Sequence, residues 1–362
     1  MNENRARTDS LREIMEKRGI DISVIGPTNN MRYLLGGTPF PDERLCLFLI
    51  THDRAQMIVP RLNVDTVRSF TDVELLVWDD DEGPERVLQS SLLHRGTVRR
   101  VAVDGSMRAD FLMSLLSSKE NIHPQSVDDM IGTLRMRKSA FEIDSLLDSA
   151  EQADRAMAAA ASACRPNVTE REVAWEAEAA FRRDGAEEVV FTLVASGMNG
   201  AHPHHCSGEK KLKAGEGIII DIGASLNGYK SDITRVVFLG KPSKEFSKVY
   251  DTVLEANKRA RETVRKGISA YEVDRAARSV IEEAGYGEFF IHRTGHGIGL
   301  DIHEAPWIQQ GSQARLDAGM VFSIEPGIYL PGRFGVRIED IVAVTEKEVR
   351  VLTGFDHGLI EK

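Results

Sequence analysis

Cysteine pairs, long apolar runs and a targeting segment are all missing from this sequence. Its three cysteines, Cys46, Cys164 and Cys206, are widely spaced and form no C-x-x-C motif. This spacing argues against a disulfide framework and favours a reducing compartment, so we expect a cytoplasmic protein. No apolar run approaches the roughly 18 residues of a membrane-spanning helix, and the polar residues 1–5 do not resemble a signal peptide. We therefore expect a soluble protein.

Positive charge is also in deficit. The chain has 46 basic and 56 acidic residues, which gives a formal net charge of −10 over 362 residues. This balance argues against nucleic acid and against an anionic membrane surface as binding partners. The length favours two domains, because a domain typically has about 100–200 residues.

The type of element changes along the chain, and the change marks the expected domain boundary. Short strand candidates alternate with helices at first, which predicts a smaller α/β domain over residues 1–132. A structure-breaking stretch at 122–138 separates it from long helices and β-hairpins. These predict an α+β domain over 133–362, in which helices cover a curved sheet. The long helices are expected over residues 139–164, 169–182, 243–265 and 269–284.

One apolar hairpin carries a carboxylate in each of its strands. Residues 218–223 and 231–238 are rich in β-branched side chains and flank an Asn-Gly turn signal that begins at residue 227. The simplest register places Asp221 opposite Asp232, with both side chains on one face and about 5 Å apart. Two like charges held so close away from water would repel, so we expect a cation between them.

A second hairpin repeats this arrangement. Glu325 and Glu339 each lie in an apolar run, and the turn between them is centred on Gly332, so these carboxylates should also face each other. Four converging carboxylates suit two divalent ions about 3.5–4 Å apart. His296 lies between two glycines that leave its imidazole unshielded, and it could supply a nitrogen ligand. On these residues alone, a cation site without catalysis stays open.

Together these motifs resemble those of the pita-bread metallopeptidases, in particular the branch that contains Xaa-Pro aminopeptidase (aminopeptidase P) and prolidase. The N-terminal part is similar to the creatinase-type N-terminal domain, so the resemblance extends over nearly the whole chain. It implies a creatinase-type domain over 1–132 and a pita-bread catalytic domain over 133–362. The matching segments are Asp221-Ile-Gly-Ala, Ser231-Asp-Ile-Thr-Arg, Gly295-His-Gly-Ile-Gly-Leu-Asp-Ile-His303, Glu325-Pro-Gly and Arg337-Ile-Glu-Asp.

The resemblance also implies a role for each candidate residue. Two divalent ions would be held by five ligands, and manganese is the expected metal, with cobalt, zinc or iron as alternatives. The implied ligands are Asp221, Asp232, His296, Glu325 and Glu339, of which Asp232 and Glu339 would touch both ions. The other implied active-site residues are Glu325 again as general base, His303 at the scissile carbonyl, His204 at the substrate, Arg337 behind a ligand, and His292.

The implied activity is hydrolysis of the Xaa-Pro bond at the N-terminus of a proline-containing peptide, by a homodimeric aminopeptidase. An Xaa-Pro dipeptidase (prolidase) is the alternative. Several dipeptidases of this family carry an arginine directly after the His-Glu-x-Pro segment, to bind the dipeptide carboxylate. Trp307 stands there in this chain, which favours the aminopeptidase. A non-catalytic pita-bread binding module and a metal-free creatinase-like amidinohydrolase are remoter alternatives, because both usually lack acidic ligands that are present here.

Overall fold

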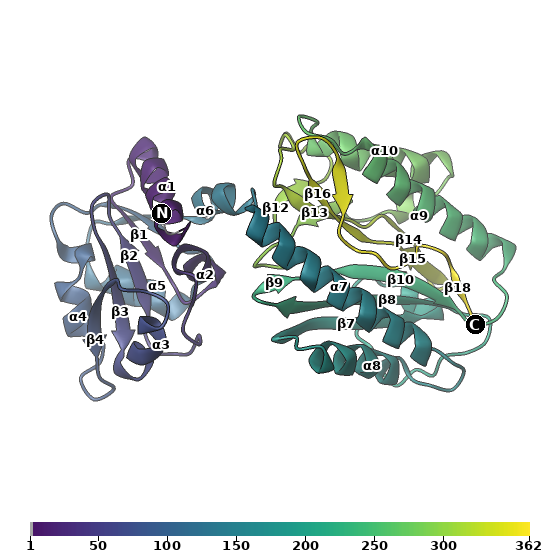
Figure 1. The fold of residues 1–362 in the computed structure, drawn as a ribbon, viewed down its shortest axis with the longest axis horizontal. Helices are drawn as coiled ribbons and strands as arrows, with labels where there is room; N and C mark the ends of the chain where they lie inside the picture. The colour runs from purple at the N-terminus through teal and green to yellow at the C-terminus, as the bar shows by residue number, and fades with distance from the viewer. Residues whose placement is uncertain (1–2) are drawn as a thin grey trace. The chain divides into compact units, whose positions relative to one another are not determined.

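The computed structural model describes residues 3–362, which form two compact units. The first unit ends at Arg135, and the second spans Met136–Lys362. Each unit contains both helices and strands, as Figure 1 shows. No helix in the described part of the chain is long and apolar enough to cross a membrane.

The first unit is built on a six-stranded mixed sheet in the order β4-β3-β2-β1-β5-β6. The central strand β1 runs antiparallel to β2 and parallel to β5, which agrees with the expected α/β class. The strands are β1 Ile22–Ile25, β2 Leu47–Ile50, β3 Ala55–Pro60, β4 Glu74–Trp78, β5 Arg100–Val103 and β6 His123–Ser126. The helices are α1 Glu3–Arg18, α2 Asn29–Leu35, α3 Val64–Arg68, α4 Glu85–Ser90, α5 Ala109–Ser118 and α6 Asp128–Arg135.

The second unit has four long helices, which occur in two pairs along the chain. Capping boxes at Ser139, Thr169 and Ser269 satisfy the first free N–H groups of three of them. The helices are α7 Ala140–Ala163, α8 Glu170–Arg183, α9 Lys244–Thr263 and α10 Ala270–Glu283.

Hydrogen bonding divides the expected curved sheet of this unit into three parts. Two five-stranded sheets have the orders β18-β10-β8-β7, with β9 also paired to β8, and β12-β11-β13-β16-β17, while β14 and β15 form a separate hairpin. Pairing is antiparallel except between β10 and β18. The strands are β7 Glu188–Ser196, β8 Gly217–Leu226, β9 Tyr229–Lys230, β10 Ile233–Phe238, β11 Gly295–Gly297, β12 Glu304–Ile308, β13 Val321–Ile324, β14 Gly327–Leu330, β15 Phe334–Arg337, β16 Asp340–Val344, β17 Val349–Val351 and β18 Ile360–Glu361.

Strand β8 lies between two helical layers and is therefore apolar on both faces. Ile218, Ile220 and Ile222 pack in one core cluster with buried residues of α7 and α8. Ile219 packs in another cluster, with residues of α9 and α10 (Figure 1). Because side chains alternate along a strand, Asp221 lies on the same face as Ile219. A single carboxylate is thus placed inside an otherwise apolar surface.

The register of the first hairpin differs from the one expected. Asp221 pairs with Thr234 instead of Asp232. Asn227 and Gly228 have positive φ values of 53° and 84° and form the two-residue turn themselves, so the centre of the hairpin lies one residue later than the simplest register assumed. Asp232 is consequently a diagonal neighbour of Asp221, and the even shift keeps both side chains on one face.

The second hairpin has the predicted register. Ile324 pairs with Asp340 in the β13–β16 ladder, and Gly327 pairs with Arg337 in the β14–β15 ladder. The two ladders are separated by a break, and the residues pair in the same register on both sides of it. Glu325 lies opposite Glu339 within that break, so both carboxylates leave the sheet where it is interrupted.

A buried ion pair joins the two hairpins. Arg235 on β10 donates to Asp340 on β16 at 2.9 Å, and the side chains are 1% and 0% exposed. Arg235 also donates to the backbone carbonyls of Glu339 at 2.6 Å and of Phe355 at 2.7 Å. This guanidinium therefore fixes the position of the Glu339 backbone relative to β10.

Replacing Arg235 should destabilise the protein strongly. We expect Arg235→Met to lower the free energy of unfolding by about 3–5 kcal/mol, because the buried Asp340 carboxylate loses its fully buried arginine partner. The matched control is Arg259→Ala, which removes an exposed ion pair with Glu255 on α9 and should cost about 0–1 kcal/mol. Urea unfolding followed by circular dichroism measures both. Equal effects for the two variants would contradict this account.

Candidate active site

Five carboxylate and imidazole side chains converge from separate strands on one cavity of about 1250 Å³. They come from β8, from the residue before β10, from β11 and from the two breaks beside the β14–β15 hairpin. These are the expected metal ligands Asp221, Asp232, His296, Glu325 and Glu339. His204, His292, His303 and Arg337 line the same cavity.

The tightest part of this group consists of Asp232, His296 and Glu339, all of them buried. One ligand atom of each lies within 4.8 Å of the others. Glu325 joins them, since its Oε1 lies 3.3 Å from His296 Nε2. His296 Nδ1 faces the Gly297 carbonyl at 3.0 Å and donates its proton there, which leaves the Nε2 lone pair directed at the carboxylates. Such an arrangement is repulsive without a cation.

Two oxygen atoms of the group have no hydrogen-bond partner. Asp221 Oδ1 and Glu339 Oε1 are buried and unpaired within the described chain. Arg337 Nη2 donates to the second oxygen of Asp221 at 2.5 Å, and Thr234 Oγ1 donates to the second oxygen of Glu339 at 2.8 Å. Leaving a buried acceptor unsatisfied costs about 1–3 kcal/mol, and more for a charged group. Divalent ions would satisfy both oxygens, so the residues present fit a metal site.

The electrostatics agree with this conclusion. Burial, together with the neighbouring carboxylates, raises the pKa values of Asp232 and Glu339 well above their ordinary range. Burial also raises the pKa of Glu325 to about 7. Burial lowers the pKa of His296 to about 3, so its imidazole is neutral and available as a ligand. In the metal-free protein, protons on the carboxylates take the place of a cation.

Replacing Asp232 should make the stability of the protein less dependent on divalent metal. Asp232→Asn removes one of the mutually repelling charges, so we expect this variant to be more stable than the wild type in chelator at pH 8. We also expect it to lose most of the rise in melting temperature that divalent metal gives the wild type. The exposed Asp251→Asn on α9 is the matched control and should behave as the wild type. An Asp232→Asn protein that metal stabilises as strongly as the wild type would contradict the assignment.

The metal-free protein should also become less stable as the pH rises. Glu325 has its pKa raised from 4.5 to about 7 in the folded protein, so between these values the folded state binds more protons than the unfolded state. Stability therefore falls with increasing pH in this window. Urea unfolding in chelator from pH 4.5 to 7.5 measures the slope. Glu325→Gln should reduce it, whereas the exposed Glu151→Gln should not; an unchanged slope in Glu325→Gln would refute the link.

Behind Asp221, a chain of hydrogen bonds supports this expected ligand. Arg337 Nη1 donates to Tyr329 Oη at 2.8 Å, and Tyr329 Oη lies 2.8 Å from His292 Nε2. His292 Nδ1 donates to the Arg293 carbonyl at 2.7 Å, so Nε2 accepts the tyrosine proton. Burial lowers the pKa of His292 to about 4, which keeps it neutral. His292 thus acts on the cluster through Tyr329 and Arg337.

Three residues of the site were not identified from the sequence. Thr234 binds Glu339, and the register found here places it opposite Asp221. Ser323 Oγ lies 3.2 Å from Glu325 Oε1 and accepts the His296 backbone N–H at 3.0 Å. Ser323 lies two residues before Glu325 on a strand, and this spacing could have identified it from the sequence. Tyr329 could have been found in the same way, because the predicted second register makes it a diagonal neighbour of Arg337.

The remaining histidines divide into two groups. The His303 ring meets His296 edge-on at 4.3 Å between centroids, and both His303 and His204 are exposed at the cavity. His205 instead lies 2.8 Å from the buried Glu170 carboxylate, which also accepts from Ser196 Oγ at 2.7 Å. This anchor holds the loop that carries His204. Glu170 gave no recognisable signal in the sequence.

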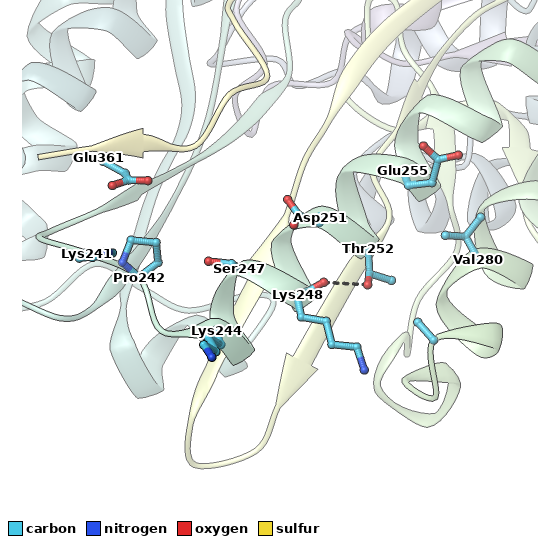
Figure 2. Close-up of a pocket in the computed structure, with 11 residues that line it drawn as sticks. Lys241, Pro242, Lys244, Ser247, Lys248, Asp251, Thr252, Glu255, Val280 and Glu361 are labelled. Carbon is cyan, nitrogen blue, oxygen red and sulfur yellow. Dashed lines mark hydrogen bonds between the residues drawn. The ribbon is translucent and has the colours of Figure 1, made fainter.

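A second hollow, of about 760 Å³, lies beside the start of α9 (Figure 2). Its walls carry both lysines and acidic residues, among them Lys244, Lys248, Asp251 and Glu255. No histidine or cysteine is among the described residues that line it. The chemistry of the molecule is therefore concentrated in the first cavity.

Comparison with known proteins identifies the family. The family model described as Metallopeptidase family M24 matches residues 144–346. The chain belongs to metallopeptidase family M24. In this M24 chain, residues 7–137 match the Creatinase/Prolidase N-terminal domain. The predicted family is thereby confirmed, and membership of a metallopeptidase family implies divalent metal ions.

Individual relatives match the M24 chain over nearly its full length. The Xaa-Pro dipeptidase of Pyrococcus horikoshii is 35% identical over 350 residues, which cover 96% of this chain and 97% of the relative. The crystal structure of a prolidase from Thermococcus sibiricus has a TM-score of 0.95 and 36% identity, and the match covers 100% of both chains. An X-Pro aminopeptidase structure from Thermotoga maritima has a TM-score of 0.85 and 32% identity, covering 98% of this chain and 99% of that one.

These comparisons confirm the pita-bread fold and the metallopeptidase class. They also correct the sequence-based preference for an aminopeptidase, because proteins named as Xaa-Pro dipeptidases match better in both identity and TM-score. The preference depended on Trp307 standing where related dipeptidases carry an arginine. A single residue, packed against the cavity-lining Arg293, weighs less than similarity over the whole chain.

Proposed function

We propose that this protein is an Xaa-Pro dipeptidase that uses two divalent metal ions. The observation that carries the proposal is the cluster of unsatisfied carboxylates and a neutral imidazole, in a chain similar throughout its length to Xaa-Pro dipeptidases. Manganese is the proposed metal, with cobalt, iron or zinc as alternatives, because the ligands are mainly oxygen with one imidazole and no thiolate. The proposed ligands are Asp221, Asp232, His296, Glu325 and Glu339, with Asp232 and Glu339 shared between the ions.

The protein's own side chains would carry the proton transfers. Two bound divalent ions would lower the pKa of a water molecule and polarise the scissile carbonyl. Glu325, oriented by Ser323, would act as general base and then deliver the proton to the proline nitrogen as it leaves. His303 would donate a hydrogen bond to the developing oxyanion. His204, on the loop anchored by His205, would contact the substrate.

Positioning would fall to the hydrogen-bond chain behind the cluster. Arg337 holds one oxygen of Asp221 and leaves the other free for a ligand. Tyr329 and His292 in turn fix the Arg337 guanidinium. A carboxylate held at the end of this chain would meet the free amino group of the substrate and so confine cleavage to the first peptide bond.

The second candidate function is Xaa-Pro aminopeptidase action on longer peptides. One observation favours it: Trp307, a neutral residue, occupies the position that several related dipeptidases use to bind the dipeptide carboxylate. The two functions differ in substrate length, while the metal centre would be the same in both. Substrate length is therefore the property to measure.

The test compares Ala-Pro with Ala-Pro-Ala as substrates. The enzyme is first stripped with chelator and then reloaded with Mn²⁺, Co²⁺, Zn²⁺ or Fe²⁺. We expect no activity in chelator, restoration by metal, and a kcat/KM for the dipeptide roughly tenfold or more above that for the tripeptide. Faster cleavage of the tripeptide would identify an aminopeptidase instead. Full activity in chelator would contradict the metal mechanism itself.

We also propose that the enzyme is a homodimer in the cytoplasm. The resemblance to the pita-bread peptidases supports the dimer, and the unpaired thiols of Cys46, Cys164 and Cys206 support a reducing compartment. Analytical ultracentrifugation at micromolar concentration should give the mass of two chains. A single species at the mass of one chain would refute the dimer.

A further inference from the structure

The active-site cavity is too large to select a dipeptide by size. Its volume of about 1250 Å³ exceeds the roughly 300–1,000 Å³ of typical ligand pockets. A dipeptidase needs instead a group that recognises the substrate's C-terminal carboxylate. In an Xaa-Pro dipeptide this carboxylate belongs to the residue directly after the cleaved bond, where a longer peptide has a neutral amide. A fixed cation near the catalytic centre would make this distinction.

Three arginines and no lysine are among the described residues that line the cavity. Arg337 is buried and engaged by Asp221. Arg171 forms an ion pair with Glu209, and its side chain is 65% exposed. Arg293 is different: among residues 3–362, no acidic side chain lies within ion-pair distance of its guanidinium. Its charge is available for an anion from outside the chain.

An aromatic ring holds the Arg293 guanidinium in place. Its Cζ lies 4.5 Å from the centroid of the Trp307 ring. Trp307 pairs directly with the expected metal ligand His296 across β11 and β12. Stacking uses the flat face of a guanidinium and leaves the N–H groups at its edge free for a carboxylate. Trp307 stands where several related dipeptidases carry a carboxylate-binding arginine. In this chain it supports a different arginine, Arg293.

Arg293 is also close to the reacting groups. It lines the same cavity as His296 and His303, and its stacking partner Trp307 pairs with His296 across β11 and β12. The side chain is half-buried, and burial lowers its own pKa below the ordinary value. A partly desolvated guanidinium binds a carboxylate more strongly than an exposed one does, because less solvent screens the pair.

These observations assign a specificity role. We infer that Arg293, stacked on Trp307, binds the C-terminal carboxylate of the dipeptide and thereby selects substrates of two residues. The inference rests on the proposed dipeptidase function. It places the selecting cation three residues before His296, directly beside the position where several related dipeptidases carry their arginine.

The test uses one pair of substrates that differ only in that carboxylate, Ala-Pro and its amide Ala-Pro-NH2, with the manganese-loaded enzyme. The wild type should strongly prefer the free acid. In Arg293→Met, kcat/KM for the acid should fall by roughly 30-fold or more, mainly through KM, because a partly buried charge partner is lost. The value for the amide should change little, so the acid-to-amide ratio should approach one.

Matched variants separate this role from general damage. Arg171→Met removes the other peripheral arginine of the cavity and should keep the wild-type ratio. Arg293→Lys retains the charge but loses the planar guanidinium, so its acid-to-amide ratio should be intermediate. This variant also tests the inference if Arg293→Met does not fold. Trp307→Phe should keep the preference and Trp307→Ala should reduce it. Metal content and melting temperature are measured for each variant.

Two outcomes distinguish failure of the inference from failure of the function. If the wild type prefers the acid and both Arg293 variants keep the full preference, the assignment of Arg293 is wrong and the dipeptidase function stands. If the wild type hydrolyses the acid no better than the amide, or cleaves neither, the dipeptidase function fails and this inference fails with it.

Discussion

The mutual repulsion of buried carboxylates is the constraint on which the rest of this structure depends. Asp232, Glu325 and Glu339 lie around the neutral side of one imidazole, at the ends and breaks of strands that are otherwise apolar. Protons or cations must compensate for such a group, because burial makes free negative charge costly. The fold supplies rigidity, through the Arg235–Asp340 pair and the two helical layers, so that the carboxylates cannot move apart. Divalent ions bound among these carboxylates would relieve the repulsion.

The hydrogen bonds around the cluster leave some oxygens free as well as holding others. Arg337 and Thr234 each bind one oxygen of a carboxylate and leave its partner oxygen unpaired. His292 and Tyr329 orient Arg337 in turn, and both stay neutral because they are buried. These hydrogen bonds orient the expected ligands. The same principle explains why His205, which contacts no ligand, is tied to the buried Glu170: it fixes the loop of His204.

The residues that we propose to select the substrate lie outside the carboxylate cluster, where the constraint on the residues is weaker. Trp307 stands where several related dipeptidases carry a cation, yet its ring stacks against Arg293, which lies just before the neighbouring strand β11. The charge needed near the substrate's carboxylate can therefore come from a different element than in several relatives. Reading one position by itself favoured the aminopeptidase, whereas the comparisons over the whole chain favour the dipeptidase. The role of a cationic subsite depends on where the charge lies in space and not on which residue carries it.

The sequence by itself determined the two kinds of domain, the second hairpin and the convergence of its glutamates, since all of these follow from local periodicity and turn chemistry. It placed Asp221 and Asp232 on one face but two positions out of register, because which residues of an Asn-Gly turn lie at its centre depends on their φ angles. Thr234, Ser323 and Tyr329 were not predicted, because the role of a hydroxyl group depends on its hydrogen-bond partner, which the sequence does not show. Only the tertiary structure decided which arginine of the cavity is free, because ion pairing joins residues that are distant in sequence and follows no period.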